Sequence, residues 1–130
     1  MMFPLIQDED SAREVADALA EADQFALDLE AAGFHRYSDR LCLIQISTRE
    51  QTWILDPLSF ETREVIRDAV EDPGTLTVMH GADFDLRLLD RDPHVNHISL
   101  RALIAGSDHN QLRILNARMP VFVTGIGLAV

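Results

Sequence analysis

Residues 25–32 decide the fold, and they read Phe25-Ala26-Leu27-Asp28-Leu29-Glu30-Ala31-Ala32. Large apolar side chains alternate with other residues in this stretch, and a period of two is typical of a β-strand. Asp28 and Glu30 then project from one face of the strand, with Cα atoms about 6.5 to 7 Å apart. Burying unpaired carboxylates is costly. Two interpretations follow: the pair binds a metal ion, or it faces water on an ordinary half-buried edge strand.

Strands and helices are predicted on both sides of this stretch. The predicted strands are Pro4–Ile6, Phe25–Leu29, Leu41–Ser47, Thr52–Leu55 and Thr75–Met79. The predicted helices are Ala12–Ala22, which a capping box of Ser11 and Glu14 opens, Phe60–Val70 and Ala82–Leu89. Three consecutive strands with short connections favour an antiparallel meander, and the helix, strand and helix that follow make the pattern mixed α/β.

The composition is that of one globular domain with an acidic surface. The chain has 130 residues, 47% of them hydrophobic and 25% charged, and a formal net charge of −11. Phosphate contacts need clustered basic side chains, so this charge argues against a broad basic surface for nucleic acid. Any nucleic-acid chemistry is therefore local, and divalent ions held by carboxylates would supply its positive charge. The single cysteine, Cys42, lies in an apolar run and is predicted to be buried and unreactive.

Neither a signal peptide nor a membrane span is indicated. Residues 1–10 lack a basic region followed by an apolar one, and no run of about 18 apolar residues occurs. The apolar end of the chain, residues 121–130, is too short to cross a bilayer. A cytoplasmic location without membrane contact is therefore expected.

Residues 93–130 differ in character from the rest of the chain. Residues 1–92 hold 21 of the 22 acidic residues and eight of the 11 arginines. The tail contains one short helix candidate, Leu100–Ala105, and the apolar end at 121–130, which is a possible surface for self-association. We expect residues 1–92 to be the N-terminal part of a domain, and residues 93–130 to be a divergent tail that arises from a truncation or a frame shift.

Asp85 lies just after a predicted strand end, in the block His80-Gly81-Ala82-Asp83-Phe84-Asp85. A carboxylate in the first turn of a helix is favoured by the exposed backbone N–H groups and the helix dipole. Helix capping is the simpler explanation for Asp83, whereas Asp85 is placed to face a cleft at the strand end. His80 is predicted to be structural, because hard cations prefer oxygen ligands.

Four blocks of the chain resemble, in order and spacing, ribonuclease D and its relatives, which are proofreading-type 3′-5′ exonucleases with an RNase H-like fold. The blocks are Phe25–Glu30, Tyr37–Ile46, Ile54–Leu58 and Val78–Leu86, within roughly residues 3–92. The resemblance implies an RNase H-like mixed sheet, an antiparallel meander followed by helix, strand and helix, that is incomplete at its C-terminal end.

The resemblance also implies a site and a reaction. Asp28, Glu30 and Asp85 would hold two divalent ions, Mg²⁺ or Mn²⁺, and catalyse hydrolysis of terminal phosphodiester bonds at the 3′ ends of RNA or single-stranded DNA. Phe84 would contact the terminal base or sugar. His35 and Tyr37 are weaker candidates for substrate contact, because a solvated loop explains them equally well.

The family's third motif, a Tyr or His four residues before a fourth carboxylate, has no counterpart in this sequence. The only acid after Asp92 is Asp108, and Ile104 stands four residues before it. Three explanations remain open: a truncation or frame shift near Pro93, a non-catalytic nucleic-acid- or metal-binding module that keeps the fold, or a second chain that completes the site. An interaction module with solvated acids is the alternative outside the family.

Overall fold

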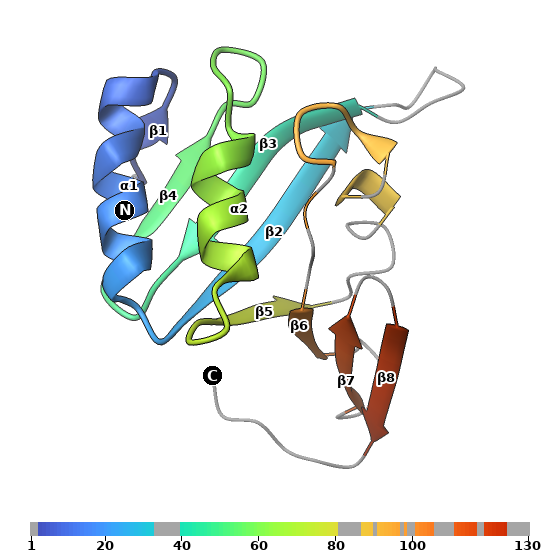
Figure 1. Cartoon of the computed structure of the whole chain (residues 1–130). Coiled ribbons are helices and arrows are strands. Elements are labelled where there is room, and N and C mark those ends of the chain that lie inside the picture. The colour runs from blue at the N-terminus through green and yellow to red at the C-terminus, as the bar shows by residue number, and fades with distance from the viewer. Residues whose placement is uncertain are drawn as a thin grey trace.

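One mixed β-sheet organises the molecule (Figure 1). The computed structural model describes residues 3–32, 40–80, 87–89, 91–96, 98, 101–105, 111–116 and 119–124. Within them, eight strands lie in the order β1-β4-β3-β2-β5-β6-β7-β8. Their bounds are β1 Leu5–Ile6, β2 Gln24–Ala32, β3 Arg40–Ser47, β4 Thr52–Leu55, β5 Leu76–His80, β6 Arg101–Ala105, β7 Gln111–Asn116 and β8 Met119–Thr124. The predicted mixed α/β architecture is confirmed.

The first half of the sheet is the predicted antiparallel meander. β2 pairs with β3, and β3 with β4, in antiparallel register. On its other side β2 pairs with β5 in parallel, from Gln24 opposite Leu76 to Ala26 opposite Val78. β2 is therefore an interior strand at residues 24–26, and the interpretation of residues 25–32 as an edge strand is wrong for that part.

Two helices cover one face of the sheet (Figure 1). α1 spans Glu9–Glu21 and α2 spans Arg63–Glu71. The N-cap of α1 is Asp8, whose Oδ1 accepts a hydrogen bond of 2.7 Å from the Ser11 backbone N–H. The predicted capping box is thus wrong, because Ser11 lies inside the helix and donates to the cap. In the described part of the chain, no helix has both the length and the apolar character needed to span a membrane.

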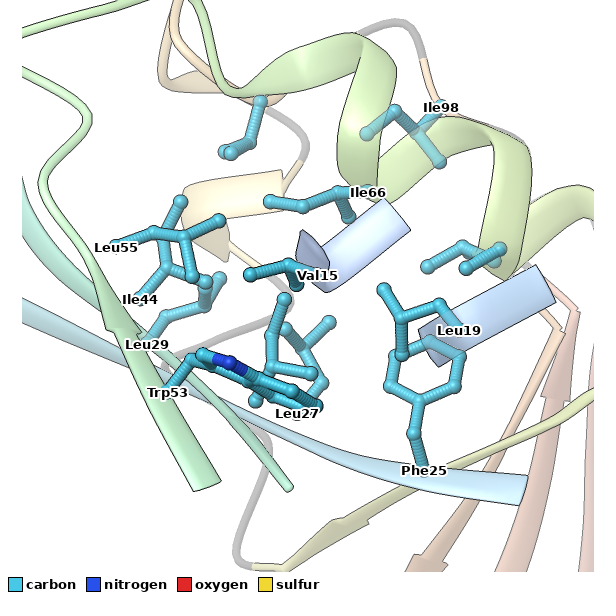
Figure 2. Close-up of a cluster of buried hydrophobic side chains, with 14 of the residues drawn as sticks. Val15, Leu19, Phe25, Leu27, Leu29, Ile44, Trp53, Leu55, Ile66 and Ile98 are labelled. Atoms are coloured by element: carbon cyan, nitrogen blue, oxygen red, sulfur yellow. The ribbon is translucent and has the colours of Figure 1, made fainter. Parts of the chain in front are cut away.

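The hydrophobic core lies between these helices and the sheet (Figure 2). Alternate residues of β2 point into it, and Phe25, Leu27 and Leu29 are each at most 4% exposed. The strands β3 and β4 and the two helices add further fully or almost fully buried side chains, namely Ile44, Ile46, Trp53, Leu55, Val15, Leu19 and Ile66. Because strand side chains alternate, the residues between these buried positions face the side of the sheet that the helices do not cover.

The core contains side chains from both sides of residue 92. Val95 is fully buried and Ile98 is 9% exposed, and both belong to the same cluster as the β2 residues. Beyond them, the predicted helix Leu100–Ala105 is wrong, since residues 101–105 form β6, which pairs in parallel with β5. The predicted helix Ala82–Leu89 is described only at residues 87–89, which are helical. The division at residues 92 and 93 stays a prediction.

Candidate active site

Asp28 and Glu30 lie on the face of β2 that is opposite to helices α1 and α2. Both side chains are exposed. Leu27, which precedes Asp28, and Leu29, which lies between the two acids, are buried on the face that the helices cover. The alternation predicted from sequence is therefore what separates the acids from the core. The strand carries the two carboxylates side by side, with Cα atoms about 6.5 to 7 Å apart.

Neighbouring strands supply the floor around the two acids. Gln45 of β3 is the register partner of Asp28, and Leu43 is the partner of Glu30. The row through Asp28 and Gln45 continues to Ile54 of β4 and Leu5 of β1. Leu43 and Leu5 are 37% and 52% exposed. The site is thus two carboxylates and one amide, with the exposed apolar side chain of Leu43 opposite Glu30, a combination that suits a metal-bound phosphate next to a sugar or base.

The two carboxylates are available to a ligand. Within the described part of the chain, no hydrogen bond or ion pair engages the side chain of Asp28 or Glu30. The arginine–carboxylate pairs seen there lie elsewhere, at Arg13–Asp10, Arg49–Asp23 and Arg67–Glu64. Two adjacent acids that have no cationic partner among the described residues form a local negative field that favours a divalent cation.

A β-bulge next to Glu30 distorts the ladder between β2 and β3. Glu30 pairs with Leu43 but Ala31 pairs with Leu41, so Cys42 is the extra residue on β3. The Cys42 Sγ donates to the Glu30 carbonyl oxygen at 3.3 Å. Burial raises the pKa of the Cys42 thiol, and the nearby Glu30 charge raises it further. Cys42 is half-buried, less than predicted, and stays a protonated hydrogen-bond donor at neutral pH.

Only part of the predicted site lies in the described residues. Asp85, Phe84, His35 and Tyr37 fall outside them, so their roles stay predictions. Among the described residues, no three His, Cys, Asp or Glu side chains form a group able to hold a metal ion. Asp28 and Glu30 fit such an ion in chemistry, because both offer carboxylate oxygens on one exposed face. Sequence reasoning missed Gln45, whose only signal is its place in the alternating run of β3.

A mixed α/β sheet that carries an acidic pair on the face opposite its helices is the arrangement that the resemblance to RNase H-like exonucleases predicts. The chain belongs to the 3′-5′ exonuclease family, whose model matches residues 3–116. The predicted likeness to ribonuclease D-type exonucleases is confirmed, and the match extends past residue 92.

Two curated relatives illustrate the similarity. Protein RRP6-like 2 of Arabidopsis thaliana is 35% identical over 92 residues, which are 69% of this chain and 11% of that protein. Exosome complex component 10 of Homo sapiens is 31% identical over 104 residues, 79% of this chain and 11% of that protein. The chain therefore spans about a tenth of the length of these relatives.

Solved structures share the fold. The catalytic core of RRP6 from Trypanosoma brucei superimposes with a TM-score of 0.67 at 25% identity, over 80% of this chain and 29% of that one. Escherichia coli RNase D gives a TM-score of 0.63 at 24% identity, over 69% and 24% of the two chains. RNase D of T. brucei in complex with RNA gives 0.61 at 18% identity, over 75% and 36%.

Proposed function

We propose that this chain carries the Asp28–Glu30 part of a 3′-5′ exoribonuclease active site and hydrolyses the terminal phosphodiester bond of single-stranded RNA. The observation that supports this most directly is the exposure of both carboxylates on one face of β2. Family membership favours an enzyme over a non-catalytic binding module that only keeps the fold.

RNA is the proposed substrate because of the relatives. E. coli RNase D is described as an exoribonuclease involved in structured RNA processing, and T. brucei RNase D has been solved with RNA. The present chain offers one exposed apolar side chain next to the acids, Leu43, which is the register partner of Glu30 and is 37% exposed. Such a side chain suits apolar packing of a terminal nucleoside.

Divalent ions are the proposed cofactor, as Mg²⁺ or Mn²⁺ held by Asp28, Glu30 and Asp85. When bound, such ions activate water and neutralise charge at the scissile phosphate. The chain's own contribution is to fix two oxygen ligands on β2 and to place Gln45 opposite Asp28, where its amide would donate to a phosphate oxygen or to an ordered water.

A 5′-labelled single-stranded RNA tests the proposal. We expect the full chain with Mn²⁺ to shorten this RNA one nucleotide at a time from the 3′ end, and chelation to stop the reaction. Asp28→Asn should remove the activity. Asp68→Asn is the matched control, because Asp68 is an exposed carboxylate on α2, over the opposite face of the sheet.

The rate at which the chain shortens single-stranded DNA of the same sequence, compared with the rate for the RNA, gives the substrate preference. Intact RNA after prolonged incubation with Mn²⁺ would contradict the proposal and favour the binding module. Equal activity in the Asp28→Asn protein would contradict the site, because the cleavage would then come from another source.

A further inference from the structure

Asp92 is a buried carboxylate with two backbone partners. Its residue is 6% exposed. Its Oδ1 accepts from the His94 N–H at 2.9 Å and its Oδ2 from the Leu41 N–H at 2.8 Å, across 51 residues of sequence. A buried carboxylate is tolerated only where hydrogen bonds compensate its lost hydration, and each charge-assisted bond is stronger than a neutral one. The link between Asp92 and Leu41 is therefore a strong local constraint.

Comparison with two similar turns shows what is special about Asp92. The chain contains three Asp-Pro turns in which the aspartate Oδ1 accepts from the N–H two residues later: Asp56 to Leu58 at 3.0 Å, Asp72 to Gly74 at 2.8 Å and Asp92 to His94 at 2.9 Å. The turns at Asp56 and Asp72 form at less buried positions. The Asp56 Oδ2 also accepts from a distant residue, the exposed Gln7 side-chain amide at 3.3 Å. Among the three, Asp92 is the one whose second oxygen accepts from the backbone N–H of a strand.

The strand amide that Asp92 binds lies at the bulge beside Glu30. Leu41 pairs with Ala31, immediately after the register shift that leaves Cys42 without a partner on β2. Bulges bend a strand and re-aim the side chains next to them. On the other side of the bulge, the Cys42 Sγ donates to the carbonyl of Glu30 itself. The bulge is thus held at Leu41 by Asp92 and at Cys42 by the Glu30 backbone.

The segment that carries Asp92 is itself fixed to α2. The Arg63 side chain donates to the Pro93 carbonyl and, at 3.1 Å, to the Asn96 Oδ1. The Thr62 hydroxyl donates to the His94 carbonyl at 3.5 Å. Val95 anchors the same segment in the core. Asp92 therefore transmits the position of a rigid segment to the start of β3.

We propose that Asp92 is a positioning residue for Glu30: its carboxylate fixes the bulge at Leu41 and Cys42, and the bulge sets the direction in which the Glu30 carboxylate leaves the sheet. The role in metal binding rests on the function proposed above. The geometric part does not, because it concerns the protein alone.

Asp92→Asn in the full chain tests both parts, with Asp72→Asn as the matched control. The amide replaces one acceptor oxygen with a donor, which then faces a backbone N–H at Leu41 or His94. Asp72→Asn makes the same change in the same kind of turn, away from the bulge. We expect Asp92→Asn to shift the backbone amide resonances of Glu30 and Cys42 in metal-free protein and to weaken Mn²⁺ binding about tenfold or more. Asp72→Asn should do neither, although both substitutions lower the urea midpoint.

The outcomes separate the proposals. Unmoved Glu30 resonances, or unchanged Mn²⁺ affinity, in folded Asp92→Asn protein would overturn the positioning role. If the unsubstituted chain binds no Mn²⁺, the proposed function fails, and the Glu30 resonances alone then decide whether Asp92 positions this residue. If Asp92→Asn does not fold, Cys42→Ala releases the bulge from its other side without touching a buried charge. A shift of the Glu30 amide in Cys42→Ala supports the role, and an unshifted amide overturns it.

Discussion

At the level of single residues, Asp28 and Glu30 lie on a sheet face that water reaches. This exposure removes the main objection to two acids in an apolar stretch, which is the cost of burying unpaired charge. The same strand buries Leu27 and Leu29 against the helices, so one sequence pattern both builds the core and presents the site.

We expect Asp28 and Glu30 to act as a unit in binding metal. Asp28→Asn and Glu30→Gln should each weaken Mn²⁺ binding by more than about 100-fold, and the double variant should be little worse than either, because neighbouring ligands of one ion are not additive. Isothermal titration with Mn²⁺ measures this. Asp68→Asn should bind as the parent does, and additive losses in the double variant would show two independent sites.

The acidic pair was predictable from sequence, but its supporting residues were not. Alternation along residues 25–32 is a local signal and predicts that Asp28 and Glu30 share a face. The place of Gln45 beside Asp28 depends on strand register, and the bond from Leu41 to Asp92 joins residues 51 positions apart. Neither relation is encoded in local periodicity, so sequence reasoning assigned Asp92 no role at the site.

At the level of elements, helix α1 depends on its N-cap. Asp8 accepts the Ser11 N–H, and this backbone hydrogen bond is the largest cause that lowers the pKa of Asp8 below its ordinary value of 3.8. A carboxylate with a lowered pKa in the folded state stabilises the protein above its ordinary pKa, and the contribution disappears as the pH falls through the lowered value.

We therefore expect Asp8→Ala to have a lower melting temperature than the parent chain at pH 7. The difference between the two melting temperatures should become smaller as the pH falls below 3.8. Circular dichroism melts between pH 7 and pH 2.5 measure this. Asp8→Asn keeps an acceptor for Ser11 without a titrating charge, so its melting temperature relative to alanine should not follow the pH in this way. A gap between parent and Asp8→Ala that is the same at every pH would rule out the charged cap.

Element type was predictable where the period was clear and failed where the segment was short. β4 has the predicted bounds, Thr52–Leu55, because alternation and turn residues mark both ends. Residues 101–105 form a strand instead of the predicted helix, since a segment of four apolar residues after Arg101 is too short to carry a decisive period and pairing with β5 determines its conformation.

Val95 tests how far the packed unit extends. Its side chain is fully buried, three residues past the predicted division. Val95→Ala in the full chain should lower the free energy of unfolding by about 2 kcal/mol, from lost burial and the cavity left behind. Urea unfolding measures the change. Leu58→Ala, at a side chain that is 64% exposed, should change it by less than about 0.5 kcal/mol. If Val95→Ala changed the free energy of unfolding as little as Leu58→Ala does, residue 95 would lie outside the cooperative unit.

At the level of the whole molecule, the net charge limits where RNA could bind, and the sheet extends beyond the acid-rich part of the chain. A net charge of −11 disfavours binding of RNA along a broad surface, so the proposed contact is local, at the acidic pair. The family match to residue 116 includes β6 and β7, so similarity and sheet pairing both continue beyond the acid-rich part of the chain. A cytoplasmic location stays a prediction.

The outer strand β8 carries the start of the apolar run that sequence predicts as a self-association surface. In the described residues β8 pairs with β7 on one side and ends the sheet order, and such an edge presents unpaired backbone groups to another chain.

We expect the average mass in sedimentation equilibrium to rise above 14.6 kDa with concentration. Phe122→Lys should hold it at the monomer mass, because a charged side chain on an edge strand opposes pairing. Since Lys makes the net charge less negative, electrostatic repulsion between chains would not explain that result. Leu58→Lys, at an exposed apolar residue between β4 and α2, is the control and should associate as the parent does. A parent chain that stays at the monomer mass at every concentration would refute self-association, and with it the explanation in which a second copy completes the site.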